Sequence, residues 1–320
     1  DAVYDQSRRI WNGMIDKPPA VIAEVRGTSD VMAAVDLARE HGLTVAVRGG
    51  GHNVAGSSIC EGGIVIDLSG MNGVWVDPQR RRVRAQGGAT LVDVDRETQL
   101  YGLATPLGAV SATGIAGLTL NGGVGHLRRQ YGLSCDNLTA VEIVTADGRL
   151  RTASPEENPD LFWALRGGGG NFGVVTAFEY QLHGVGPELY GLFVWHEADD
   201  NATPMKRFRE WTADAPREAS VLAFFGFIPE LEEFPRERWG RPCYAMLGAY
   251  NGPLEEGEEV FRSLRGFAEP VADFSGPQSY NGLQTTLDED YPDGLHYYWK
   301  AVYLRELSDP VLEVITRRGA

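Results

Sequence analysis

The first residues with a spacing suited to chemistry are three glycines between an arginine and a histidine, Arg48-Gly49-Gly50-Gly51-His52-Asn53. Glycines lack a Cβ, so their backbone N–H groups can converge on an anion such as a pyrophosphate, to which an arginine adds positive charge. Three adjacent glycines also form tight turns between strands. The run therefore predicts either a phosphate cradle or a structural turn.

His52 sharpens this choice, because an imidazole inside a phosphate-binding turn can bond to a bound cofactor or act on it. A lone histidine is more often a polar turn residue, and His41 reads as a cation at a helix C-terminus. No H-x-x-x-H or H-E-x-x-H spacing suggests a metal site. The three cysteines, Cys60, Cys135 and Cys243, lie far apart and indicate neither a disulfide framework nor a zinc site.

A second glycine-rich stretch, PLGAVSATGIAGLTLNGGVG, spans residues 106–125. It is too long for a turn and is predicted to be too rich in glycine for a helix, so its backbone is expected to lie against something flat. A pyrophosphate cradle together with a long glycine wall suits a large planar dinucleotide, which favours FAD over NAD. The alternative is an irregular structural loop.

A third cluster, Gly168-x-Gly170-x-x-Gly173, matches the dinucleotide-binding fingerprint only formally. That fingerprint requires a strand before it and a helix after it. Here a helix is predicted before the glycines and a strand after them, so a Rossmann site is rejected. The sequence also lacks G-x-x-x-x-G-K-[ST] and G-x-S-x-G, the signals for ATP hydrolysis and esterase chemistry.

The first two glycine clusters must be positioned by the strands and helices that flank them. The opening is predicted to be β-α-β: a strand at 20–25, a helix capped by Ser29 and ended by Gly42, and apolar strands on either side of the first cluster. A hairpin at 74–86 and a helix from Thr90 to Tyr101 precede the second cluster.

After the second cluster, a hairpin with an Asp147-Gly148 turn and a helix beginning at Ser154-Pro155 are predicted. The segment near residue 186 is the predicted domain boundary. Beyond it, aromatic-rich strands alternate with amphipathic helices, which predicts an antiparallel sheet with helices on one face. The segment HYYWKAVYL, 296–304, is predicted to be one more strand.

The length and the net charge of the chain limit the number of domains and the classes of partner that are expected. A chain of 320 residues is expected to form two domains, or one domain with a large subdomain. With 44 acidic and 29 basic residues the net charge is −15, which repels phosphate backbones and argues against a nucleic-acid partner. No run of eighteen apolar residues and no signal-peptide pattern occurs, so no membrane partner is expected. A cytoplasmic location is the default, and a processed secretory start stays open.

Several motifs in fixed order resemble the berberine-bridge-enzyme-like branch of the FAD-linked oxidases, especially the 6-hydroxynicotine oxidase type. They are VRGGGHN (47–53), IVIDLS (64–69), QGGATLVDV (86–94), the 106–125 stretch, RQYGLSCDN (129–137), TADGRL (145–150) and DLFWALRGGGGNFGVVT (160–176). The resemblance implies an α+β fold of the p-cresol methylhydroxylase (PCMH) or vanillyl-alcohol-oxidase type. It comprises a PCMH-type FAD-binding domain of two α/β subdomains, 1–186, and a substrate domain of antiparallel sheet flanked by helices, 187–320.

The resemblance also implies the cofactor contacts. The family's R-x-G-G-H histidine, bonded to the 8α-methyl of the isoalloxazine, maps onto His52. The position of a second, cysteinyl bond found in many members is Val110 here, so a single histidyl tether is predicted. The residues implied to bind FAD are Arg48, Gly49, Gly50, Gly51, His52, Asn53, Ser57, Gly108, Val110, Ser111, Thr113, Gly114, Gly117, Asn121, Gly122 and Val175.

Catalytic residues are less well defined. Tyr131 matches a tyrosine that borders the flavin in several members, with a merely packed tyrosine as the alternative. Tyr298 and Lys300 could face a pocket, although one polar face of a strand explains them better. Relatives of this type continue with a further flavin-contacting segment that carries the general base. The chain is therefore expected to be a fragment or a shortened protein.

The function implied is transfer of a hydride from a C–H beside an alcohol or amine to flavin N5, with dioxygen as re-oxidant. The expected substrate is a small molecule that bears a ring or resembles a sugar. A flavin-binding module without turnover is the first alternative. An NAD-dependent dehydrogenase is the second, and the strand predicted after Gly173 weighs against it.

Overall fold

The computed structural model describes residues 2–198 and 202–319, which fall into two compact units. One unit comprises residues 1–185 and 284–300, and the other comprises 186–283 and 301–320. Residues 284–300 thus return to the first unit, whereas the sequence placed them in the second domain. The assignment of the two domains to cofactor and substrate stays a prediction.

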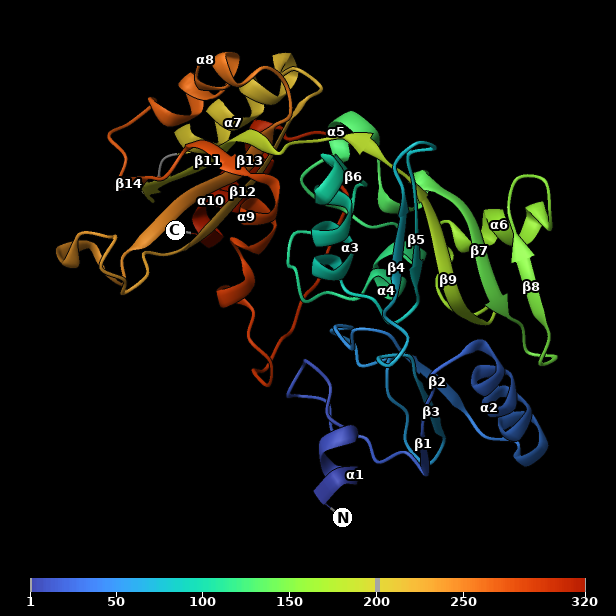
Figure 1. Ribbon diagram of the computed structural model, residues 1–320. Helices are drawn as coiled ribbons and strands as arrows, with labels where there is room; N and C mark the ends of the chain where they lie inside the picture. Colours follow the sequence, from blue (N-terminus) through green and yellow to red (C-terminus); the bar gives the residue numbers. More distant parts are fainter. Residues whose placement is uncertain (1, 199–201, 320) are drawn as a thin grey trace. The chain divides into compact units, whose positions relative to one another are not determined.

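The first unit opens with a small parallel sheet of order β1-β3-β2 (Figure 1). Its strands are β1 (Val21–Glu24), β3 (Ile64–Asp67) and β2 (Val45–Arg48). The central strand β3 is buried along its whole length. Ile64 and Ile66 share a core cluster with helix α2 (Thr28–His41), and Val65 belongs to a separate cluster with Ile10 and Ile59. The predicted β-α-β opening is confirmed, although α2 begins at Thr28 with Gly27 rather than Ser29 at the N-cap.

A second, antiparallel sheet of order β4-β5-β9-β7-β8 carries the main core of this unit (Figure 1). Its strands are β4 (Val74–Asp77), β5 (Arg82–Gln86), β9 (Val174–Gln181), β7 (Leu138–Val144) and β8 (Leu150–Ala153). Helices α3 (Leu91–Thr98), α4 (Ile115–Leu120) and α6 (Pro159–Leu165) contribute buried residues to the same cluster. Both predicted hairpins are present, and the core holds the segments that flank the glycine clusters.

Shorter elements complete the unit. They are α1 (Ala2–Ser7), the paired strands β6 (Leu103–Ala104) and β10 (His183–Gly184), α5 (Arg128–Tyr131), and the 3₁₀ turns η1 (Gln99–Tyr101), η2 (Ser134–Asn137) and η4 (Asp288–Asp290).

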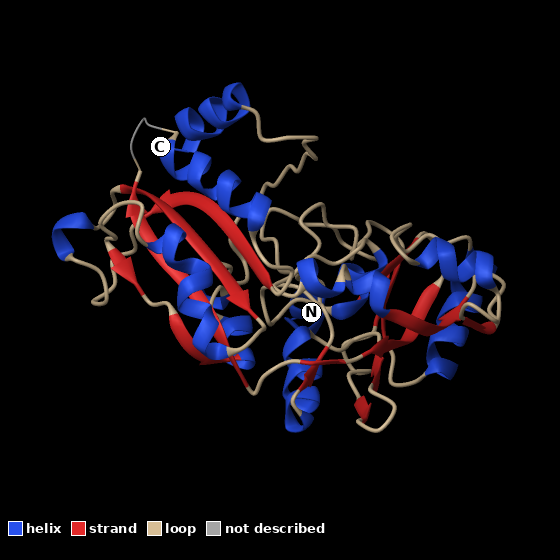
Figure 2. Ribbon diagram, turned by 90° about the horizontal axis from the view of Figure 1, so that it is seen from above, coloured by secondary structure: helices blue, strands red, loops and turns tan. Residues whose placement is uncertain are grey.

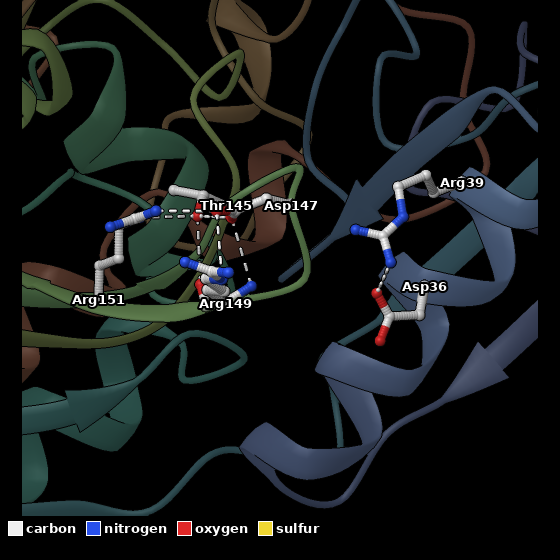
Figure 3. Close-up of polar contacts among 6 residues, drawn as sticks. All are labelled: Asp36, Arg39, Thr145, Asp147, Arg149 and Arg151. Carbon is white, nitrogen blue, oxygen red and sulfur yellow. Dashed lines mark hydrogen bonds and ion pairs between the residues drawn. The ribbon is translucent and has the colours of Figure 1, made fainter.

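Figure 3 shows the polar contacts within the Asp147-Gly148 turn and the separate ion pair of Asp36 and Arg39 on α2. Asp147 accepts hydrogen bonds from Thr145 at 2.5 Å and Arg151 at 2.8 Å, and chiefly the Thr145 bond lowers the pKa of this carboxyl to about 2. Gly148 has a φ of +75°, and a Cβ there would lie 2.2 Å from Oδ1 of Asp36 on α2. Glycine is needed at this position both for the backbone conformation and for the close approach.

Three local predictions are wrong. The 106–125 stretch does contain a helix, α4, because Ile115, Ala116, Thr119 and Leu120 are buried together and outweigh the helix-breaking tendency of glycine. The helix predicted at Ser154 begins at Pro159, since the Ser154 hydroxyl instead accepts from the N–H groups of Glu156 and Glu157 in a turn.

The third wrong prediction is the strand at 296–304. None of the strand pairings in the described residues includes this segment. The alternation of aromatic residues there reflects packing of Tyr297 against Trp11 rather than a ladder with a neighbouring strand.

The second unit is an antiparallel sheet of order β12-β13-β11-β14, with β15 also paired to β11; its long strands are drawn in red in Figure 2. The strands are β11 (Glu188–Glu197), β12 (Ala219–Phe227), β13 (Pro242–Tyr250), β14 (Ala272–Asp273) and β15 (Gly276–Ser279). The helices are α7 (Thr203–Asp214), α8 (Leu254–Arg265), α9 (Tyr280–Thr285) and α10 (Asp309–Gly319), and η3 (Arg236–Arg238) is a 3₁₀ turn.

One face of this sheet shares a core cluster with α7, α8 and α10. The other face packs on side chains of the 228–239 connection, including Ile228 and Phe234. Both units therefore combine helices with sheets, and the predicted α+β class is confirmed. Among the described residues, no helix has the length and apolar character needed to cross a membrane.

Candidate functional site

The carboxyl ends of β1, β3 and β2 meet at one edge, because the three strands are parallel. They end at Glu24, Asp67 and Arg48, and all three residues line a cavity of about 930 Å³ that also takes in Gly49–Gly51. Ligand and cofactor sites are typically roughly 300–1,000 Å³ and, in α/β sheets, open at the carboxyl ends of the strands. The size and place of this cavity suit a dinucleotide.

Arg48 is tied to the protein itself. Its buried guanidinium forms an ion pair with Asp67 and donates to the carbonyl oxygens of Ser7 at 2.5 Å and Arg9 at 3.2 Å. The paired carboxylate neutralises most of the charge that a free arginine would offer a phosphate. The first role of Arg48 is therefore structural, because it joins the carboxyl edge of the parallel sheet to the N-terminal segment.

The first glycine loop does present unused donors. In the part of the chain that the structure describes, the N–H groups of Gly49, Gly50 and Gly51 donate to no protein acceptor. Gly51 has a φ of +72°, a conformation that favours glycine. Successive free N–H groups at a cavity wall form the kind of concavity that binds anions.

The end of this loop is a closed turn. Asn53 Oδ1 accepts from the N–H of Ser57 at 3.0 Å, and the Asn53 carbonyl accepts from Gly56 at 3.0 Å. These bonds fix the backbone that follows His52. Asn53 and Ser57 thus have a structural role, and contact between either residue and a cofactor stays a prediction.

His52 is half-buried and stacks on Trp11, with ring centroids 5.0 Å apart and planes 15° apart. Burial lowers the pKa of the imidazole, while the charges of Asp293 and Asp288 oppose this effect. The ring makes no hydrogen bond with residues 2–198 or 202–319. A neutral imidazole with an unoccupied nitrogen is a competent nucleophile.

The second glycine stretch is anchored at the start of α3. The N–H groups of Leu91 and Val92 donate to the carbonyls of Thr113 at 3.0 Å and Ser111 at 3.1 Å. Ser111 in turn donates its N–H to Asp288 Oδ1 at 2.7 Å, and its hydroxyl to the other oxygen of that carboxylate. The stretch is thus fixed by protein bonds before any cofactor is considered.

The structure brings the two glycine stretches together. A Cβ on Gly50 would lie 2.4 Å from the Gly114 nitrogen. Gly117 differs, since it is exposed on α4 and an added Cβ would meet nothing within 4 Å. The protein's own packing therefore does not require glycine at position 117.

The other predicted contacts are spread more widely. Gly108 faces the side chains of Leu118 and Leu91, whereas Val110 is half-buried next to Ser111. Asn121 donates to the Gly117 carbonyl at 2.8 Å and ends α4. Gly122 has a φ of +113°.

Val175 is buried within β9 in the main core. Its carbonyl oxygen lies against Gly87, where an added Cβ would be 2.4 Å away. Only its backbone is therefore placed to approach the segment that joins β5 to α3.

Tyr131 stacks on His183 with centroids 3.9 Å apart, and His183 Nε2 lies 2.7 Å from Asn137 Oδ1. The Tyr131 hydroxyl lies 3.5 Å from the Gly184 carbonyl oxygen. Lys300 lies over the exposed ring of Tyr298, 5.4 Å from its centroid. The Tyr131 contacts agree with a merely packed tyrosine. Tyr298 and Lys300 are exposed in a segment that is not a strand, so the alternative of one polar face of a strand is wrong for them. The catalytic roles stay predictions.

The sequence reasoning missed Trp11, Asn12, Asp288 and Asp293, which come from both ends of the unit. Glu24 and Asp67 could have been found, because polar residues at the ends of two parallel strands are a recognisable signal. Trp11 and Asp288 carry no such signal, since 277 residues separate them in the chain.

Comparison with known proteins identifies the cofactor class. Residues 19–154 match a family model described as an FAD binding domain. The chain is 33% identical over 302 residues to (R)-6-hydroxynicotine oxidase of Paenarthrobacter nicotinovorans, covering 93% of this chain and 64% of that protein. The predicted resemblance to this type of FAD-linked oxidase is confirmed.

Solved structures agree. The 6-hydroxy-D-nicotine oxidase of Arthrobacter nicotinovorans superposes with a TM-score of 0.83 at 32% identity, covering 92% of this chain and 64% of that one. A glucooligosaccharide oxidase of Acremonium strictum, described with a 6-S-cysteinyl, 8α-N1-histidyl FAD, superposes with a TM-score of 0.77 at 25% identity, covering 93% and 62%. The predicted PCMH-type fold is confirmed, and the chain spans 64% of the length of each of the two nicotine oxidases.

Proposed function

Because residues 19–154 match a family model described as an FAD binding domain, we propose that this chain is the cofactor-carrying part of an FAD-dependent oxidoreductase with flavin tethered to His52. The single observation that carries the proposal is the cavity at the carboxyl edge of β1-β3-β2, which Gly49–Gly51 line with unused N–H donors. A pyrophosphate fits such a wall by hydrogen bonding. The negative charge of Asp67 does not oppose it, since Arg48 neutralises that carboxylate.

The isoalloxazine end of FAD is assigned to the second glycine stretch. Gly114 lies against Gly50, so one ligand can run from the first stretch to the second. Gly117 supports this placement, because a glycine within a helix costs about 1 kcal/mol relative to alanine and no protein atom needs the space. Val110, Ser111 and Thr113 would then border the ring and the ribityl chain.

His52 is the proposed point of attachment. Burial keeps the imidazole neutral near pH 7, which is the form that can bond to carbon. The Acremonium strictum enzyme, described with both a histidyl and a cysteinyl bond, is a precedent for the histidyl one. Val110 provides no thiol for a second bond.

FAD, when bound, supplies a two-electron acceptor for a hydride, with dioxygen as the proposed re-oxidant. The proposed donor is a C–H beside an alcohol or amine of a small molecule that bears a ring or resembles a sugar. The glycine stretches would orient the cofactor and exclude water from one of its faces. Tyr131 is the one side chain proposed to border the reacting atoms, and Tyr131→Phe should lower turnover without changing flavin content.

The test is the visible absorption spectrum of the purified protein before and after acid precipitation. We expect yellow colour that stays in the wild-type pellet, leaves the His52→Ala pellet and stays with His296→Ala, an exposed control. A colourless wild type would contradict the proposal. Bound flavin that no alcohol or amine bleaches without air would instead identify a flavin-binding module without turnover.

A further inference from the structure

Trp11 is the central ring of a three-ring stack. One face lies on His52, and the other lies on Tyr297 with centroids 3.8 Å apart and planes 7° apart. Its indole Nε1 donates to the Tyr291 carbonyl at 2.9 Å, and the residue is 4% exposed. The Trp11 indole is therefore held on both faces and at its polar edge. The His52 imidazole, by contrast, is stacked on only one of its own faces, by Trp11, among the described residues.

The neighbouring Asn12, 1% exposed, fixes the backbone on the far side of His52. Its Nδ2 donates to the carbonyls of Val54 at 2.8 Å and Tyr297 at 2.9 Å. Its Oδ1 accepts from the N–H groups of Met14 at 3.1 Å and Tyr297 at 3.0 Å. One buried amide thus joins three segments: the N-terminal one, the loop after His52 and the returning 284–300 segment.

Resting on the proposed function, we propose that Trp11 and Asn12 are positioning residues for the attachment of FAD to His52. Stacking on Trp11 limits rotation of the imidazole, and the Asn12–Val54 bond sets where the His52 backbone lies. Fixing the reacting group in this way lowers the entropy cost of bond formation. Both residues would act through His52 and not on the cofactor itself, so they are positioning residues and not catalytic ones.

The attachment step balances as follows. A C–H bond of the 8α-methyl group breaks, the imidazole N–H proton is lost, and an N–C bond forms. The two electrons and two protons released reduce dioxygen to hydrogen peroxide. The imidazole gains positive charge while the N–C bond forms and before its proton leaves. The π face of Trp11 and the carboxylates of Asp288 and Asp293 stabilise that charge.

The experiment follows covalent attachment with time. The full chain is produced in a riboflavin-auxotrophic host so that it is recovered without flavin. It is then mixed with FAD in air and precipitated with acid at intervals. Flavin retained in the pellet measures attachment, and quenching of flavin fluorescence before precipitation measures reversible FAD binding. The variants are Trp11→Leu, Trp11→Phe and the control Trp163→Leu, whose side chain is 79% exposed.

We expect Trp11→Leu to slow attachment about tenfold or more while FAD still binds. Trp11→Phe should recover much of the rate because it restores an aromatic face, and Trp163→Leu should match the wild type. If Trp11→Leu does not fold, Tyr297→Leu, which removes the ring behind Trp11, should slow attachment in the same direction.

Attachment by Trp11→Leu, or by Tyr297→Leu where that variant replaces it, at the wild-type rate would overturn the inference and leave the proposed function intact. A wild type that binds FAD and never retains it in the pellet would overturn the histidyl tether itself, and the inference with it. An equal loss of attachment in Trp11→Phe and Trp11→Leu would contradict the stacking role.

Discussion

The backbones of Gly50 and Gly114 lie in direct contact, although 64 residues separate them in the sequence. A Cβ on Gly50 would lie 2.4 Å from the Gly114 nitrogen, and a Cβ on Gly114 would lie 2.3 Å from the Gly50 nitrogen. Neither position can accept a side chain without moving the other loop. This contact joins the proposed pyrophosphate cradle to the proposed isoalloxazine wall.

Gly50→Ala should therefore destabilise the protein by about 1–3 kcal/mol, because the new methyl group overlaps backbone atoms that cannot rotate away. Urea denaturation followed by tryptophan fluorescence measures the loss. Gly170→Ala is the control, since Gly170 is exposed, has no positive φ and would carry a Cβ that meets nothing within 4 Å. An unchanged free energy of unfolding in Gly50→Ala would show that the loops can separate at little cost.

Gly117→Ala should behave in the opposite way. The residue lies within α4, and alanine there should stabilise the protein by about 0.5–1 kcal/mol. If the flavin occupies the adjacent space, the same methyl group should weaken FAD binding. The combination of a higher melting temperature and lower flavin content is the expected result, and full flavin content would place the ring elsewhere.

Arg48→Met should cost about 3–5 kcal/mol, because it leaves Asp67 buried without its partner. The exposed pair of Arg80 and Asp77 is the matched control, and Arg80→Met should cost less than about 1 kcal/mol. Chemical denaturation of both variants measures the difference. The double variant Arg48→Met, Asp67→Leu should recover part of the loss, since no unpaired charge remains.

Asp95 predicts a pH-dependent stability. Burial raises the pKa of its carboxyl from 3.8 to about 7, although Gln284 donates to Oδ2 at 2.9 Å. A raised pKa means that the folded state holds its proton longer than the unfolded state. The stability that the protonated Asp95 carboxyl contributes to the folded state is therefore fully present below about pH 4 and is lost as the pH rises towards 7.

Asp95→Asn should abolish that pH dependence and stabilise the protein at pH 8 by on the order of 2 kcal/mol. The new amide could donate to Gln284 Oε1, a buried acceptor that has no partner among the described residues. Thermal unfolding from pH 4 to pH 8 checks this, with Glu97→Gln as a more exposed control. Parallel curves for wild type and Asp95→Asn would contradict the raised pKa.

The attachment of FAD should also depend on pH. Only the neutral imidazole of His52 can react, so the rate should rise as the pH passes upward through a pKa that burial holds below 6.5. Asp293→Asn removes a charge that raises this pKa, so its profile should shift to lower pH. Timed acid precipitation between pH 5 and pH 8 measures both profiles, and a shift to higher pH would exclude this electrostatic role of Asp293.

The sequence predicted much of the local structure. Apolar runs and turn residues located the parallel strands on either side of Arg48-Gly49-Gly50-Gly51-His52 and the hairpin turn at Asp147-Gly148, because such elements depend on short-range patterns. Two of the three wrong local predictions have a shared physical cause. The helix at Ile115–Leu120 and the irregular 296–304 segment depend on what packs against them, and single-sequence patterns do not contain that information.

The same division applies to the candidate site. Glycine clusters and one histidine in the sequence predicted the class of ligand, since few ligands other than a dinucleotide need so much exposed backbone. Only the tertiary structure decided that Arg48 is bound by Asp67, that Ser111 is bound by Asp288, and that Trp11 stacks on His52. Each of these contacts joins residues that lie 19 to 177 positions apart. Burial of apolar side chains and the packing of distant segments bring such residues together. The spacing of residues along the sequence does not contain this information.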